Sequence, residues 1–197
     1  MPSQILQLNN ISFSYDSLSK PIFQSVTVNI NNGWTCIIGA NGSGKTTFLK
    51  LCINELKAQK GNVINPHFCV YCEQRTDYCP ENIEDFIFDY SKETIILKRD
   101  LDIDKEFINR WNTLSQGEKK RLQIGNALYQ NPALLAVDEP TNHLDIISIE
   151  CLENALKNIS SALLLVSHDK TFLNSLTTIN WHIEKINSDY ILKNLNR

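Results

Sequence analysis

The arrangement of apolar and polar positions predicts paired strands at the start of the chain, then alternating strands and helices. ILQLNNISFSY and PIFQSVTVNINN alternate apolar with polar residues, which is typical of strands with one buried face. Short apolar runs follow at WTCIIG, ALLAVDEP and SALLLVSHD, and segments with helical periodicity lie between them. Strands that alternate with helices indicate βαβ units, so we expect a mostly parallel core sheet and an N-terminal antiparallel β subdomain.

Three further segments complete the expected organisation. HFCVYCEQ has the pattern of another strand and ends at Gln74. The polar region from residue 80 to about 110 has amphipathic patches, which predicts a small helical insertion within about residues 75–125. The tail TINWHIEKINSDYILKNL alternates on both sides of Asn187-Ser188-Asp189, which predicts a hairpin. We expect a single α/β domain over residues 1–197.

Composition and charge argue against several classes of protein. With 42% hydrophobic and 21% charged residues, the chain resembles globular proteins rather than disordered or fibrous ones. Its net charge of −3 gives no overall attraction to nucleic acid or anionic lipid. The longest apolar runs are far shorter than the roughly 20 residues that cross a bilayer, and the start lacks a secretory signal. We therefore expect a cytoplasmic protein without direct membrane insertion.

The cysteines do not suggest a disulfide framework, because all 6 are scattered along a chain that shows no secretory signal. Cys69 and Cys72 form a CxxC pair, but they lie in the expected strand HFCVYCEQ. Residues three apart in a strand point to opposite faces. We therefore expect free thiols, and we do not expect zinc binding or redox use of this pair.

The sequence GANGSGKT, from Gly39 to Thr46, matches the phosphate-binding motif G-x-x-x-x-G-K-[ST] in full. It follows a buried strand and precedes a helix, which favours a phosphate loop over a mere glycine-rich turn. We expect Lys45 to contact the β- and γ-phosphates and the Thr46 hydroxyl to bind Mg²⁺. The other residues expected to contact the nucleotide are Gly39, Asn41, Gly42, Ser43, Gly44 and Thr47. This motif predicts an α/β protein of the P-loop NTPase class.

Four residues suited to phosphate chemistry stand at the ends of apolar strands, where ligands bind in open α/β sheets. Asp138 and Glu139 end ALLAVDEP, and we expect Asp138 to bind Mg²⁺ and Glu139 to act as general base on the attacking water. His168 ends SALLLVSH and is expected to hydrogen-bond the γ-phosphate. Gln74 is expected to bind Mg²⁺ and the same water. Any of the four could alone be structural, but the phosphate loop favours the catalytic interpretation.

The stretch LSQGEKKR predicts a second anion site. Ser115 and Glu118 have the spacing of a capping box, which by itself predicts only a well-capped helix. A capped helix N-terminus beside Gly117 can also bind an anion. Because GANGSGKT already provides the phosphate site of this chain, the surplus site suggests a second nucleotide shared with another molecule.

GANGSGKT, Gln74, LSQGE, LLAVDEP, TNHLD and His168, in this order, resemble the motifs of ATP-binding cassette (ABC) ATPase domains, and the resemblance covers nearly the whole chain. In that family two domains pair head to tail, so the resemblance implies ATP and Mg²⁺ as cofactors and an ATP-dependent homodimer. It implies that Ser115 and Gly117 contact the partner's γ-phosphate and that Asp145 lies at the interface. It also implies that Tyr15 stacks on adenine, although Tyr15 could instead belong to a strand face.

Details of the motifs point in different directions about the partner. Gln116 and Glu118 depart from the usual LSGGQ, while TNHLD, SHDKTFL and TINWHIEK resemble the ABC-F branch, soluble twin-cassette proteins that act at the ribosome. Our first expectation is the energy module of a transporter, with separate transmembrane subunits at the inner face of the membrane. The alternatives are a ribosome-associated ATPase and a free nucleotide-dependent clamp. We interpret the basic cluster Lys119–Arg121 as a solvated helix face.

Overall fold

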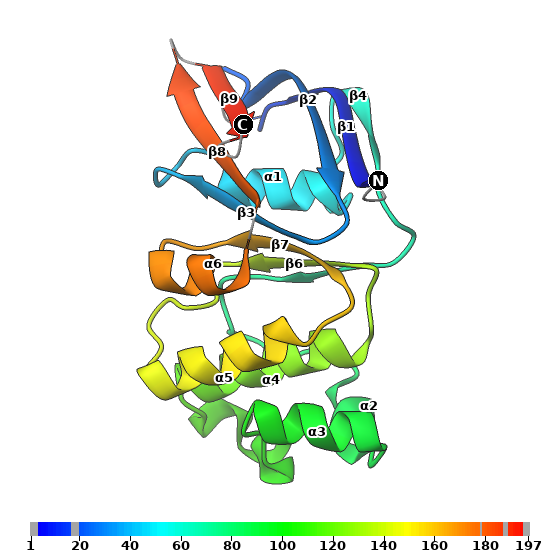
Figure 1. The fold of residues 1–197 in the computed structure, drawn as a ribbon, viewed down its shortest axis with the longest axis vertical. Helices are drawn as coiled ribbons and strands as arrows, with labels where there is room; N and C mark the ends of the chain where they lie inside the picture. Colours follow the sequence, from blue (N-terminus) through cyan, green and yellow to red (C-terminus); the bar gives the residue numbers. More distant parts are fainter. Residues whose placement is uncertain (1–3, 17–19, 178, 187–188, 195–197) are drawn as a thin grey trace.

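The computed structural model describes residues 4–16, 20–177, 179–186 and 189–194. The strands within these ranges form one 9-stranded sheet. The strand order is β4-β1-β2-β9-β8-β3-β7-β6-β5. Its core pairs β3 (Trp34–Gly39), β7 (Ala162–Val166), β6 (Leu134–Asp138) and β5 (Cys69–Cys72) in parallel. The predicted α/β fold with a mostly parallel core sheet is therefore confirmed (Figure 1).

The antiparallel part of the sheet contains the first and last strands of the chain. β1 (Gln4–Phe13) pairs with β2 (Phe23–Asn31), as the alternation predicted, and β2 buries alternate residues such as Val26, Val28 and Ile30. β1 also pairs with β4 (Lys60–Ile64), a strand that the sequence pattern did not predict. β8 (Ile179–Ile186) and β9 (Asp189–Asn194) form the predicted antiparallel pair; Asn187 and Ser188, predicted to lie at its turn, are outside the described residues.

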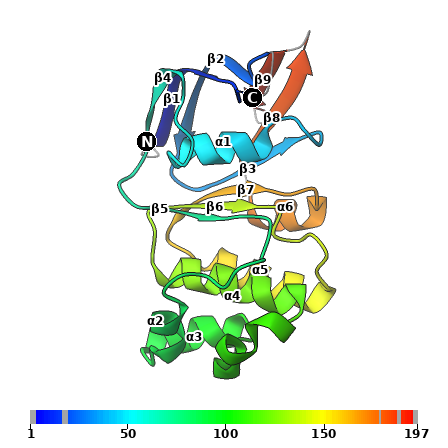
Figure 2. The ribbon, with the colours of Figure 1, turned by 180° about the vertical axis from the view of Figure 1, so that it is seen from behind.

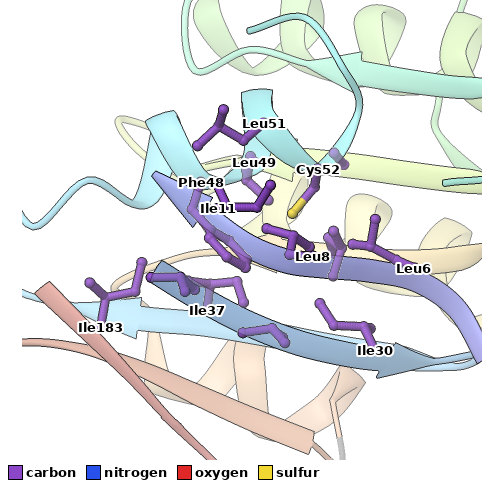
Figure 3. Packing of buried hydrophobic residues seen from close by; sticks show 14 of the residues in the cluster. Leu6, Leu8, Ile11, Ile30, Ile37, Phe48, Leu49, Leu51, Cys52 and Ile183 are labelled. Atoms are coloured by element: carbon purple, nitrogen blue, oxygen red, sulfur yellow. The ribbon is translucent and has the colours of Figure 1, made fainter. Parts of the chain in front are cut away.

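Helices cover the core strands on both sides. α1 (Lys45–Cys52) lies between the antiparallel strands and the parallel strands, whereas α4 (Gln116–Tyr129), α5 (Ile146–Lys157) and α6 (Lys170–Leu176) lie on the other side (Figures 1 and 2). Figure 3 shows Phe48, Leu49 and Leu51 of α1 packed among apolar residues of the strands. β7 is buried on both faces, because Leu164 packs toward α1 and Leu163 toward α4 to α6.

The same alternation separates the two cysteines of the CxxC pair. Cys69 packs against the apolar cluster on the α1 side, and Cys72 is buried in the cluster on the α4 side. The prediction that they point to opposite faces of a strand is therefore confirmed.

The segment between β5 and α4 forms a helical layer at the end of the molecule distant from the antiparallel strands (Figure 1). It consists of α2 (Ile83–Phe88), α3 (Lys92–Asp100) and the 3₁₀ helix η1 (Lys105–Thr113). Buried Phe86 and Trp111 attach this layer to Leu122 of α4. Within the described ranges, no helix is both long and apolar enough to span a bilayer.

Candidate nucleotide site

The phosphate loop and the carboxyl ends of the parallel strands surround a cleft of about 590 Å³. Parallel strands bring residues from distant parts of the chain to the same edge of a sheet, where ligands bind. The sequence-predicted residues that line this cleft are Asn41, Gly42, Gly44, Lys45, Thr46, Thr47, Gln74, Asp138, Glu139 and His168. The phosphate loop and the residues expected to do the chemistry therefore lie together.

The phosphate loop follows a path that leaves no room for a side chain at two of its glycines. Gly44 has a φ of +89°, and a Cβ atom there would lie 2.9 Å from Ile22 Cγ2. A Cβ atom on Gly39 would lie 2.7 Å from both the carbonyl oxygen of Ile183 and Ser43 Oγ. The loop then enters α1, whose N-terminus adds positive potential. Its main chain can therefore approach a phosphate group closely.

Lys45 supplies a fixed positive charge to the cleft. Its Nζ donates to the carbonyl oxygens of Gly39, at 3.0 Å, and Ala40, at 3.2 Å. The same atom lies 3.3 Å from His168 Nε2. These contacts keep the ammonium group against the loop, within reach of an anion that enters the cleft.

Asp138, at the end of β6, has the surroundings of a ligand for a hard cation. Its Oδ2 accepts hydrogen bonds from Thr46 Oγ1 at 2.6 Å and from the Tyr71 hydroxyl at 3.1 Å. Its Oδ1 is buried and has no hydrogen-bond partner among the described residues. A buried carboxylate oxygen without a partner is costly, and a cation would satisfy it. The oxygens of Thr46, Asp138 and Gln74 in one cleft fit Mg²⁺, which prefers such ligands.

Glu139 is held in one orientation by the next strand and by His168. It has a φ of 45°, uncommon for a residue with a side chain, and its N–H donates to the carbonyl oxygen of Val166 at 2.8 Å. Its Oε2 accepts the His168 N–H at 3.1 Å, and its Oε1 lies 3.1 Å from His168 Nε2. Burial raises the pKa of Glu139, and the charges of His168 and Lys45 lower it by less. A carboxylate with a raised pKa accepts a proton more readily, as a general base must.

Tyr15 lies beside the phosphate loop. Its hydroxyl is 3.2 Å from Thr47 Oγ1, and its ring packs edge-on against Phe13 with the centroids 5.0 Å apart. The side chain is 38% exposed, so one part of the ring remains open to a ligand. Stacking on adenine stays a prediction.

Ser115, Gly117 and Asp145 form a second group outside the lining of the cleft. Ser115 caps α4 in the predicted capping box, and the Glu118 carboxylate accepts the Ser115 N–H at 2.7 Å. Asp145 caps α5 and accepts the Ser148 N–H at 2.7 Å. A Cβ atom on Gly117 would overlap Ser148 Oγ and would lie 3.8 Å from Asp145 Oδ2. The starts of α4 and α5 therefore lie side by side.

Comparison with known proteins identifies the family. The sequence profile of the ABC transporter family matches residues 23–142. The chain belongs to the ABC ATPase family. The ABC domain is 35% identical over 181 residues to a probable ATP-binding cassette sub-family F member 3 homolog of Encephalitozoon cuniculi. It is 31% identical over 183 residues to the ribosome protection protein VmlR of Bacillus subtilis. The name of the first relative confirms the resemblance to the ABC-F branch.

The ABC domain is shorter than these relatives. The matches cover 87% and 92% of this chain but only 32% and 31% of the relatives, so the chain spans about a third of their length. A solved structure with the same fold is the ATP-binding cassette MJ0796 in a dimeric post-hydrolysis state bound to ADP and Pi. It has a TM-score of 0.79 and 20% identity and covers 97% of this chain and 99% of that chain.

The interpretation of Lys119–Arg121 as a solvated face is wrong for two of these residues. Lys120 is 3% exposed and Arg121 is 6% exposed. The segment after β5 covers Lys120, and Arg121 Nη1 donates to Asp102 Oδ2 at 2.8 Å. Burial lowers the pKa of Lys120 to about 8. A run of charged residues on a helix indicates a solvent-exposed face only when no other part of the chain packs over it.

Sequence reasoning also missed residues that belong to the site of this ABC domain. Tyr71 donates to the Asp138 carboxylate, and burial together with the negative charge of Asp138 raises the pKa of Tyr71, so it stays a donor. Asn142 and His143 line the cleft. The position of Asn142 and His143 in TNHLD, directly after the strand that ends in Asp138, was a signal that could have indicated them. Nothing in the local pattern distinguishes the role of Tyr71.

Proposed function

We propose that this ABC domain binds Mg²⁺-ATP and hydrolyses it at the interface of a head-to-tail dimer. The observation that carries the proposal is the separation of two groups on one chain. Lys45 and Glu139 line the cleft, whereas Ser115 and Gly117 stand at the start of α4 outside its lining. A capped helix N-terminus suits an anion, and the phosphate of a second chain would provide one.

The surface beside the second group supports an interface. Ile146 and Ile147, which directly follow Asp145, are 74% and 68% exposed. Adjacent exposed isoleucines on a helix that begins next to Gly117 are an apolar surface that a partner chain would cover.

The residues of the cleft suit in-line attack by water on the γ-phosphate. Lys45 would neutralise charge that develops on the phosphate oxygens, and Glu139 would accept the proton of the attacking water. His168, in contact with both side chains, would bond the γ-phosphate. Thr46, Asp138 and Gln74 would hold Mg²⁺, which would supply further charge neutralisation in the cleft. The N-terminus of the partner's α4 would complete the surroundings of the phosphate.

Size-exclusion chromatography with light scattering on Glu139→Gln tests the dimer. We expect a monomer without nucleotide and a dimer with Mg²⁺-ATP, because the variant would bind ATP but would not hydrolyse it. Ser115→Arg in the same background should bind ATP yet stay monomeric. Ser91→Arg is the matched control, since Ser91 caps α3 in the same way and lies in the helical layer. A monomer of Glu139→Gln under both conditions would contradict a homodimer.

For the partner, we propose an ABC-F-like role in which the ATP-driven dimer acts as a clamp on the ribosome. The support is the sub-family F name of one relative and the ribosome-protection name of another. Sedimentation of Glu139→Gln with purified ribosomes in Mg²⁺-ATP should place the protein in the ribosome fraction, and omission of ATP should release it. Co-purification with detergent-solubilised membrane protein would instead support the transporter role that the sequence first suggested.

A further inference from the structure

One face of α4 is bonded to the segment that contains Gln74. Gln116, Lys120 and Gln123 lie four and three residues apart, so their side chains share a face of the helix. They contact residues 73–76, which we call the Gln74 segment. Lys120 Nζ donates to the carbonyl oxygens of Glu73, at 2.7 Å, and Gln74, at 3.0 Å. Gln123 Nε2 donates to the carbonyl oxygen of Arg75 at 3.2 Å. In the other direction, Thr76 Oγ1 donates to Gln116 Oε1 at 2.8 Å.

Lys120 makes the largest contribution to this contact. It donates to two successive carbonyl oxygens of the segment and to Gln123 Oε1 at 2.8 Å, so each of its three N–H groups has an acceptor. No ion pair joins it to a carboxylate in the part of the chain that the structure describes. Burial of an ammonium group is costly, and these carbonyl oxygens are what offsets the cost.

The Gln74 segment has few other attachments. Glu73, Gln74 and Arg75 are exposed, and their side chains are not part of an apolar cluster. Gln74 nevertheless lines the cleft with Lys45 and Asp138. The position of its side chain therefore depends on a main chain that α4 holds from outside the cleft.

We propose that Lys120 is a positioning residue for ATP hydrolysis, which fastens the main chain of Gln74 to the helix that begins at Ser115. This inference rests on the proposed function, because it assigns Lys120 to the same site. Gln74 belongs to the cleft of its own chain, and Ser115 would face the cleft of the partner. Lys120 thus makes these two groups move together, and each protomer's own site is coupled to the site that it completes.

The first test is Lys120→Met, which retains the length of the side chain and removes its donors. The phosphate loop is untouched, so we expect the KM for ATP to stay within about twofold and kcat to fall about tenfold, as for other residues that orient a catalytic group. Lys98→Met is the matched control. Lys98 Nζ also donates to two carbonyl oxygens, those of Ile87 at 2.8 Å and Asp89 at 2.6 Å, but in the helical layer. It should retain wild-type kcat; an equal loss there would overturn a specific role for Lys120.

A double-mutant cycle separates positioning from a general structural effect. If Lys120 acts through Gln74, then Lys120→Met in the Gln74→Ala background should lower kcat no further than Gln74→Ala alone. Amide hydrogen exchange without nucleotide should also rise at residues 73–76 in Lys120→Met and not in Lys98→Met. Losses in kcat that multiply in the double mutant, or unchanged exchange at residues 73–76, would overturn the role of Lys120. A wild-type protein without ATP turnover would overturn the proposed function itself and the role of Lys120 with it.

Discussion

Glu139 and His168 contact each other twice, since the His168 N–H donates to Oε2 and the His168 ring nitrogen Nε2 lies 3.1 Å from Oε1. Nε2 has a single hydrogen-bonding position, and Lys45 Nζ lies 3.3 Å from it. It can therefore bond either the carboxylate or the ammonium group at one time. When Nε2 carries a proton it donates to the Glu139 carboxylate, and when it does not it accepts from the Lys45 ammonium group, so the position of the His168 proton decides which contact is a hydrogen bond.

Removal of the Glu139 charge should separate ATP binding from turnover. We expect Glu139→Gln to bind ATP as the wild type does and to lower kcat by about 10²–10⁴-fold, the range for loss of a general base. Nucleotide titration and a phosphate-release assay measure the two quantities. Glu153→Gln, on α5 and paired with Lys157, should leave both unchanged. Normal turnover by Glu139→Gln would remove Glu139 from the role of base.

The raised pKa of Glu139 predicts how stability depends on pH. In the unfolded chain Glu139 has the ordinary glutamate pKa of 4.5, and in the native state its pKa is higher. At a pH between these two pKa values, the folded protein binds more protons than the unfolded chain. Stability at this site therefore falls as the pH rises through that window, and the penalty is complete above it. Glu139→Gln removes the penalty, so its Tm should exceed that of the wild type at pH 7, and the difference should vanish below pH 4.5.

Glu118 provides a control of opposite sign for this measurement. The Glu118 carboxylate accepts the Ser115 N–H, and this hydrogen bond lowers the pKa of Glu118. The ionised carboxylate therefore stabilises the fold at any pH above the ordinary pKa of a glutamate, and this stabilisation is lost as the pH falls. Glu118→Gln should have a lower Tm than the wild type at pH 7. Equal Tm shifts in the two variants would contradict the assignment of opposite pKa directions.

Lys45→Ala should weaken nucleotide binding itself. Hydrogen bonds to a charged group contribute about 1.5–3 kcal/mol, so we expect the Kd for ATP to rise about 10- to 100-fold. Lys50→Ala is the matched control, because Lys50 lies on the same helix and pairs with Glu55 at 2.7 Å. Calorimetric titration of both variants gives the comparison, and an unchanged Kd for Lys45→Ala would argue against the phosphate contact.

The packing of α4 against α5 predicts a coupled pair of substitutions. A methyl group on Gly117 would overlap Ser148 Oγ and lie 3.1 Å from Ser148 Cβ, so Gly117→Ala should cost about 1–3 kcal/mol in the free energy of unfolding. Ser148→Ala alone should cost about 1 kcal/mol, because it removes the hydrogen bond of the Ser148 side chain to Asp145. The double variant should cost less than the sum, because the hydroxyl that obstructs the methyl group is gone. Urea unfolding of the three variants measures the coupling, and strict additivity would contradict this contact.

The cleft could be predicted from the sequence because each of its chemical groups directly follows an apolar strand. GANGSGKT, Asp138-Glu139 and His168 need only the strand pattern and the parallel order of the sheet to lie at one edge. β4 could not be predicted in this way. Its sequence KGNVI does not alternate apolar with polar residues, because most of the strand is exposed and no face of it has to be buried. Only its pairing with β1 makes it a strand.

Lys120 shows the limit of local patterns at the site. A lysine between Lys119 and Arg121 has the sequence of a solvated face, and its burial depends on a segment that lies 46 positions earlier. Tyr71 likewise meets Asp138 only because β5 and β6 are neighbours in the sheet. Contacts between elements that are distant in sequence decide the function of such residues, and periodicity carries no information about them.

The sheet order also determines when the domain can be completed during synthesis. β8 and β9 lie between β2 and β3, so β1 and β2 are joined to the parallel core by two strands that are synthesised after that core. Until residues 179–194 emerge, β2 and β3 each present an unpaired edge, which another chain could bind. The growing chain therefore passes through a stage in which both halves of the sheet exist but the sheet is open between β2 and β3, and pairing of β8 and β9 closes it.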